Sequence, residues 1–169
     1  MSGYEFTLVL DREPTETEED AIATHAPAIL GVEGGNIALA HADVEADDFA
    51  TALVTVVRQV EALGLAVVGL HTDDLVSVKE IAQRTGRSYE GVRLLATGRR
   101  GPGGFPAPIS REPWGLYSWT VVALWFTENF ARQRLEFDRQ AAVADHLLRA
   151  RHMAGGADHG AKWARLLTA

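Results

Sequence analysis

The apolar residues of the first 73 positions change their spacing from one segment to the next, and this constrains the fold more than any other feature. In residues 4–11 they alternate, which predicts a strand with one apolar face. That face carries Tyr4, Phe6, Leu8 and Leu10. In residues 45–64 they recur at three and four positions, which predicts an amphipathic helix. Its apolar stripe comprises Phe49, Leu53, Val56, Val57, Val60 and Leu63.

The segments between and after these two complete a β-α-β-β-α-β order. Thr15, preceded by proline and followed by acidic residues, predicts a helix start, because carboxylates stabilise the positive end of the helix dipole. Residues 29–44 predict two short strands, and residues 65–72 predict a last one. In the second of the two short strands we expect one face to carry Ile37, Leu39 and His41. Asp47 or Asp48 is placed to cap the second helix and Gly64 to end it. The order predicts an α+β protein that begins with a ferredoxin-like domain over residues 1–73.

Charge is distributed unevenly along the chain. The whole chain has a net charge of −7. Residues 1–73 contain 14 acidic and two basic residues, which is a net charge of −12. Residues 74–119 have seven basic and four acidic residues, a net charge of +3, and residues 120–169 carry +2. Such asymmetry indicates units with different partners, because a polyanion repels the first segment and attracts the second.

Several classes of function find no support in the composition. The chain has no cysteine, so we expect a cytoplasmic protein without disulfides or thiolate metal sites. Its six histidines are scattered, which predicts no metal site. We expect no membrane span and no signal peptide. The glycine-rich residues 101–104 lack the Lys-Ser/Thr of a phosphate loop, and no nucleophile–base pair is apparent, so we expect neither a cofactor nor an enzyme.

Residues 74–97 predict two short helices with a tight turn between them. Ser77 and Glu80 have the spacing of a capping box, which starts the first helix, and Gly86 ends it. Ser88 is placed to cap the second helix. The inner faces of the two helices comprise Val78, Ile81, Ala82, Val92 and Leu95. Two short helices joined in this way are typical of a helix-turn-helix. The Gly/Pro-rich residues 98–112 then predict an extended wing, followed by a short strand over 116–119.

Residues 75–126 resemble the winged helix-turn-helix of the excisionase and MerR type. The resemblance rests on the pattern EIA…TG.S…VR.L…G…FP.P…W…V..W, in which helix, turn, wing and closing tryptophan helix follow in order. The matching positions are Glu80, Ile81, Ala82, Thr85, Gly86, Ser88, Val92, Arg93, Leu95, Gly98, Phe105, Pro106, Pro108, Trp119, Val122 and Trp125. One departure is Gly91, which costs about 1 kcal/mol relative to alanine in a helix unless a close backbone approach requires it.

This resemblance implies a DNA-binding protein with a recognition helix over residues 88–97 and a basic wing over 98–112. Arg93 is the candidate for a bidentate contact with guanine, while Arg99 and Arg100 are candidates for phosphate contacts. The complete set of implied DNA-contacting residues is Lys79, Arg84, Arg87, Ser88, Tyr89, Glu90, Arg93, Thr97, Arg99 and Arg100. The alternative is that these candidate residues are ordinary solvated side chains on the surface, with no role in binding. For Phe105, Trp119 and Trp125 we expect a place in the core.

The sequence leaves three functional hypotheses open. The first is a transcriptional regulator that binds double-stranded DNA, with domains at 1–73, 74–127 and 128–169. Its last domain is a helix that weakens near Asn129 and ends in a loose tail. A homodimer or a protein partner would form through the acidic domain or that helix. The second is an antitoxin- or adaptor-like interaction module whose acidic domain binds a basic partner. The third, a regulator that senses a small molecule, requires a pocket that the sequence does not display.

Overall fold

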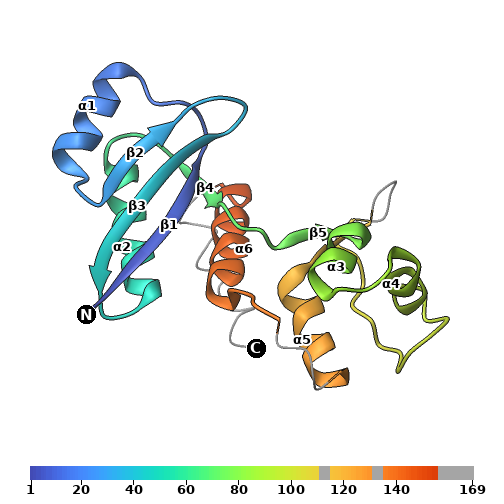
Figure 1. The fold of residues 1–169 in the computed structure, drawn as a ribbon. Coiled ribbons are helices and arrows are strands. Elements are labelled where there is room, and N and C mark those ends of the chain that lie inside the picture. The colour runs from blue at the N-terminus through green and yellow to red at the C-terminus, as the bar shows by residue number, and fades with distance from the viewer. Residues whose placement is uncertain (111–114, 131–134, 156–169) are drawn as a thin grey trace. The chain divides into compact units, whose positions relative to one another are not determined.

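A computed structural model describes residues 1–110, 115–130 and 135–155 (Figure 1). This part of the chain is mixed α+β, with six helices, a four-stranded antiparallel sheet and a sheet of two strands. The chain divides into two compact units. Unit 1 is Met1–His71 with Val143–Ala169, and unit 2 is Thr72–Ala142. This division differs from the three segments expected, because the C-terminal residues from Val143 group with the first unit. The tail that was expected to be loose, residues 156–169, lies outside the described residues.

Unit 1 contains the four-stranded sheet. Its elements are β1 (Ser2–Leu10), α1 (Glu16–His25), β2 (Ile29–Glu33), β3 (Ala38–Ala46), α2 (Phe49–Ala62), β4 (Val67–Leu70) and α6 (Arg139–Met153), whose first residues belong to unit 2. The strand order is β2-β3-β1-β4, and each neighbouring pair is antiparallel. The β-α-β-β-α-β order of residues 1–71 is therefore as the sequence predicts.

The buried face of the sheet comes from β1 as predicted, but β3 contributes different residues. In β1, Leu8 and Leu10 are buried and pair with Ala40 and Ala38. The even-numbered alanines of β3 therefore lie on the core side. Leu39 and His41 share one face as expected, but it is the opposite, half-buried face. Ile37 precedes the strand and is 55% exposed. The packing of α2 explains why small residues occupy the core side of β3. The Phe49 ring of this helix packs edge-on against Phe6, with the ring centroids 5.8 Å apart. Small alanines leave space for this bulky helix.

Helix α6 is attached to strand β4 of unit 1 through polar side chains. The Asp145 carboxylate is buried and accepts the backbone N–H of Leu70 at 2.8 Å. Arg149 donates to the same carboxylate at 2.8 Å. A Cβ added to Gly69 would lie 2.8 Å from Asp145 Oδ1, so glycine at this position allows the close approach. Arg151 pairs with Glu61 at the end of α2. The C-terminal helix is thus fastened to unit 1 by polar contacts that no local sequence pattern predicted.

Unit 2 packs short helices and two short strands around an aromatic core. Its elements are β5 (Leu75–Ser77), α3 (Val78–Thr85), α4 (Tyr89–Ala96), β6 (Leu116–Ser118) and α5 (Trp119–Asn129). The core comprises Val76, Ile81, Ala82, Val92, Leu95, Tyr117, Trp119, Val122, Ala123, Trp125 and Phe126. The strand β5 was not expected, and it pairs antiparallel with β6. The weak point expected near Asn129 is the end of α5, and α6 begins ten residues later, at Arg139.

The segment expected to be a wing is fastened to the core of unit 2. Its described part, residues 98–110, contains no strand. Phe105 packs against Trp125, with ring centroids 4.9 Å apart, and the Trp125 indole N–H donates to the carbonyl of Gly103 at 3.1 Å. The backbone of Ile109 donates to Leu116 at 2.7 Å. Residues 111 and 112, which complete the expected wing, lie outside the described residues.

Candidate nucleic-acid interface

Helices α3 and α4 are joined by a turn of three residues, and each begins at the predicted cap. Ser77 and Glu80 form the capping box, in which the Ser77 N–H donates to the Glu80 carboxylate at 2.7 Å. These hydrogen bonds hold the pKa of Glu80 below its usual value. Gly86 ends α3 in the left-handed conformation, at φ 65° and ψ 26°. Ser88 then caps α4 by accepting the Gly91 N–H at 3.1 Å. The short turn brings the apolar sides of both helices into one core.

Gly91 lies close to the cap of its own helix. A Cβ at this position would lie 3.0 Å from Ser88 Oγ, the atom that accepts the Gly91 N–H. A methyl group there would be in tight contact with the capping hydroxyl, although Glu80 carries a Cβ at the equivalent third position of α3 and forms a capping box with Ser77. The glycine is therefore compatible with the cap, and the cap does not require it.

Four of the ten expected DNA-contacting residues are engaged within unit 2. The Arg87 guanidinium lies over the ring of Phe130 at 4.3 Å and over that of Phe126 at 5.2 Å. The Arg84 guanidinium lies over Trp119 at 5.0 Å and donates to the carbonyl of Asp73 at 3.1 Å. Ser88 is the cap of α4, and the Thr97 hydroxyl donates to the carbonyl of Arg93 at 2.9 Å. These contacts give each of the four a structural role.

Three expected residues lie together on the outward side of α4. Tyr89 is 55% exposed. Arg93 and Glu90 form a bidentate ion pair, with Arg93 Nε and one terminal nitrogen each donating at 2.7 Å to a different carboxylate oxygen. This pair lowers the pKa of Glu90 and raises that of Arg93, in both cases mainly through the hydrogen bonds between them. Another acceptor could bind the same two nitrogens only if Arg93 released this carboxylate.

The last three expected residues are exposed cations. Lys79 lies on α3, while Arg99 and Arg100 follow α4, where their backbone N–H groups donate to the carbonyl of Leu94 at 3.0 and 3.2 Å. Among residues that the structure describes, no carboxylate lies within ion-pair distance of these three side chains. Their charge is available to an anionic partner.

A pocket of about 330 Å³ lies beside the first turn of α4. Its lining residues are Arg87, Ser88, Gly91, Leu95, Arg100, Gly101 and Phe130. The sequence indicated Arg87, Ser88 and Arg100 as DNA contacts, but gave no reason to group them with Gly101 and Phe130. Only the apolar spacing of Phe126 and Phe130, four positions apart at the end of α5, indicated that the latter turns toward the core.

The described residues contain neither a metal site nor a membrane-spanning helix. No group of three or more His, Asp or Glu side chains there is arranged to hold a metal ion. None of the helices in that part of the chain combines the length and the apolar character needed to cross a bilayer. Comparisons with protein-family models, with curated proteins and with solved structures find no match to this chain.

Proposed function

We propose that unit 2 is a winged helix-turn-helix of the excisionase and MerR type that binds double-stranded DNA, with α4 as its recognition helix. The observation that carries the proposal is the exposed side of α4. There Tyr89, Glu90 and Arg93 lie on the first turns of a short capped helix. The unpaired cations Lys79, Arg99 and Arg100 lie on α3 and just after α4. A helix in the major groove reads base edges with its first turns, while cations on either side bind phosphates.

The acidic unit 1, for which we propose a ferredoxin-like fold, would act against non-specific DNA binding. Residues 1–73 carry a net charge of −12, which repels phosphates. A single small module contacts few phosphates, so we propose that the protein binds DNA as a dimer. A transcriptional regulator is the function that combines these properties best.

The test is fluorescence anisotropy with the full chain and duplexes from the promoter region of its own gene, at several salt concentrations. We expect affinity to fall steeply with salt, because bound cations release counterions from the DNA. Arg99→Ala and Arg100→Ala should each lower the log–log salt slope by roughly 1 and weaken binding to all sequences alike. Absence of binding to every duplex at low salt would contradict the proposal and favour the interaction module, in which acidic unit 1 binds a basic partner.

A separate pair of variants tests the reading role of Arg93. Arg93→Ala should reduce discrimination at one base position roughly 5- to 150-fold. Glu90→Gln removes the carboxylate that competes with the base for Arg93 and should strengthen binding to the preferred duplex. Glu80→Gln serves as the matched control, because it makes the same change in charge in the first turn of α3. An equal gain from both variants would show a general charge effect and no role for the Glu90–Arg93 pair.

A further inference from the structure

We propose that the pocket beside α4 binds a small organic anion, a carboxylate or a phosphate monoester with an apolar body. Arg87 and Arg100 would hold the charged oxygens, and the body would contact Leu95. This inference goes beyond DNA binding, since it concerns a small ligand and is tested without DNA. It gives the protein the pocket that a regulator responding to a small molecule requires.

The size and lining of the pocket fit such a ligand. Small-molecule sites are concave, are lined mostly by apolar groups and contain a few polar groups that orient the ligand. The volume of about 330 Å³ suits a molecule of a single ring. Leu95 and Phe130 supply apolar surface, and Gly91 and Gly101 leave room because they carry no side chain. A Cβ at Gly101 would lie 2.5 Å from Leu95 Cδ2, so a larger residue there would push Leu95 out of place.

Arg87 brings a fixed and uncompensated positive charge to this pocket. Its guanidinium is held over Phe130 and Phe126 at 4.3 and 5.2 Å, which restrains the position of the group. Its Nε is buried and has no hydrogen-bond partner among the described residues. The described residues provide no carboxylate within ion-pair distance of Arg87. A buried donor without an acceptor costs free energy, which an anion placed against the guanidinium would recover.

Arg100 brings a second positive charge to the same pocket. The backbone of Arg100 is tied to Leu94 at 3.2 Å, so the start of its loop is anchored to α4. The acid of α4 that could neutralise either arginine, Glu90, is occupied by its bidentate pair with Arg93. Arg87 and Arg100 both line the pocket, so both can contribute positive charge to an anion that lies there. A guanidinium matches the two oxygens of a carboxylate or phosphate in a bidentate arrangement, which favours these groups over a halide.

The experiment is an NMR titration of the full-length ¹⁵N-labelled protein with benzoate and with phenyl phosphate, which distinguish the two oxyanions. Acetate has the charge without the ring, and benzyl alcohol has the ring without the charge. We expect saturable shifts of the Ser88, Gly91 and Gly101 amides with at least one of the two aromatic anions. Acetate and benzyl alcohol should each bind at least tenfold more weakly.

The variants contrast two neighbouring arginines. Arg100→Gln should weaken binding of the aromatic anion at least tenfold, whereas the matched control Arg99→Gln should change it less than twofold, because Arg99 does not line the pocket. Arg87→Lys keeps the positive charge but lacks the planar guanidinium group, so it should also weaken binding of the aromatic anion. Equal effects of the two glutamine variants would overturn the proposal, since they would indicate general attraction of anions. Absence of saturable shifts up to about 50 mM of either anion would also overturn it. DNA affinity has no part in either outcome, so the two proposals fail separately.

Discussion

At the scale of single residues, Arg84 and Arg87 are held by aromatic rings of unit 2. Arg87 lies over two rings of the α5 region, and Arg84 lies over Trp119. Both arginines come from the end of α3 or the turn after it, so these contacts fasten that turn to α5. Arg87 thus contributes to stability as well as to the proposed anion pocket.

We predict that Arg87→Ala lowers the free energy of unfolding of unit 2 by roughly 1–2 kcal/mol, because two cation–π contacts and the packing of the aliphatic stem are lost. Arg99→Ala is the matched control, since its exposed side chain contacts no aromatic ring among the described residues. Urea unfolding followed by tryptophan fluorescence measures both variants. If the two variants were equally stable, the ring contacts of Arg87 would have no net effect.

At the scale of elements, two side chains from different parts of the chain accept hydrogen bonds from the backbone N–H groups of the first turn of α5. Ser118, the cap, accepts the Val121 N–H at 3.4 Å. Asp74 is buried, and its carboxylate accepts the Thr120 N–H at 2.7 Å. The carbonyl of Asp74 also accepts the Trp119 N–H at 2.6 Å. The residue that was expected to begin a new domain therefore anchors the start of α5.

Replacement of Asp74 by alanine should destabilise unit 2 by about 1–3 kcal/mol, because the buried Thr120 N–H would lose its acceptor. Asp74→Asn retains one oxygen acceptor and should cost less. Hydrogen exchange of the Thr120 amide checks the cause, since only the alanine variant should expose it strongly. Equal exchange of the Thr120 amide in the two variants would show that the loss of stability does not come from this hydrogen bond.

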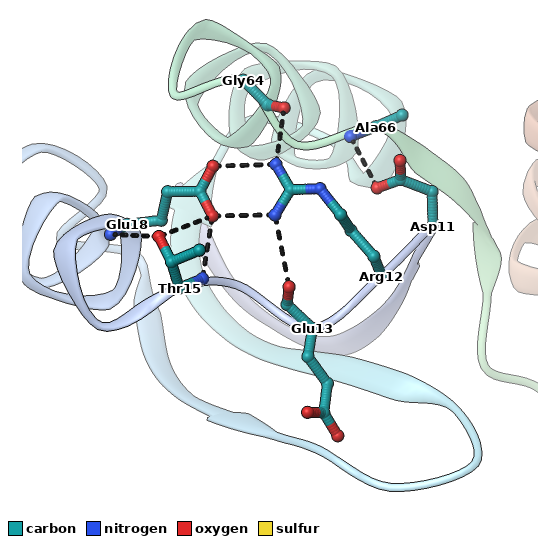
Figure 2. Close-up of polar contacts among 7 residues, drawn as sticks. All are labelled: Asp11, Arg12, Glu13, Thr15, Glu18, Gly64 and Ala66. Carbon is teal, nitrogen blue, oxygen red and sulfur yellow. Dashed lines mark hydrogen bonds and ion pairs between the residues drawn. The ribbon is translucent and has the colours of Figure 1, made fainter.

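Helix α1 begins with a network that makes its stability depend on pH (Figure 2). Two terminal nitrogens of Arg12 donate to the two oxygens of Glu18, each at 2.8 Å, and the Thr15 N–H donates to Glu18 at 2.8 Å. Figure 2 also shows Arg12 reaching the carbonyl of Gly64 at 3.4 Å, which joins the start of α1 to the end of α2. The hydrogen bonds from Arg12, followed by those from Thr15, lower the pKa of Glu18 to about 2.

A lowered pKa in the folded state stabilises the protein at a pH above the pKa of the unfolded state, about 4.3. This contribution is lost as pH falls from about 4.3 toward about 2, as Glu18 becomes protonated. We therefore predict that the protection factors of the α1 amides, corrected for the pH dependence of intrinsic exchange, fall as pH is lowered over this range, and that Glu18→Gln reduces this fall. Glu16→Gln is the control, because Glu16 lies in the same turn but makes no hydrogen bond with the described residues. The same pH dependence in both variants would rule out the Glu18 network as its cause.

At the scale of the whole molecule, the chain leaves unit 1 after His71 and returns to it at Val143. Unit 1 is therefore discontinuous in sequence. Asp145 of the returning segment supplies the acceptor for the Leu70 N–H of β4, and Arg151 pairs with Glu61. Residues 1–73 alone lack both contacts, so the acidic segment should depend on the C-terminal helix for part of its stability.

We predict that a chain truncated after Asp138 has faster exchange of the Leu70 amide, by at least tenfold, because this N–H loses its acceptor. Asp145→Ala in the full chain should show the same effect and cost about 1–3 kcal/mol, while Asp145→Asn, which keeps an oxygen, should be milder. Unchanged exchange in the truncated chain would show that unit 1 folds fully without α6.

Interactions between residues three or four positions apart were readable from the sequence. The caps Ser77 and Ser88 were identified from such local patterns, and so was the apolar stripe of α2. For Thr15 the sequence predicted a helix start, and the structure identifies it as the cap. Each depends on a hydrogen bond or a side-chain row within one helical turn, and the local order of residues decides both. The order of strands and helices in residues 1–71 followed from the same local periods.

Tertiary structure decided what depends on segments far apart in the chain. The buried face of β3 was set by pairing with β1 and by the bulk of α2, not by the hydrophobicity of Leu39. The place of Arg87 was set by Phe130, 43 positions away, and the return of α6 by a hydrogen bond between Asp145 and Leu70. The same sequence pattern is compatible with many such long-range pairings, and only the packing of the folded chain selects one. The pocket beside α4 was therefore invisible in the sequence, although each of its arginines was singled out there.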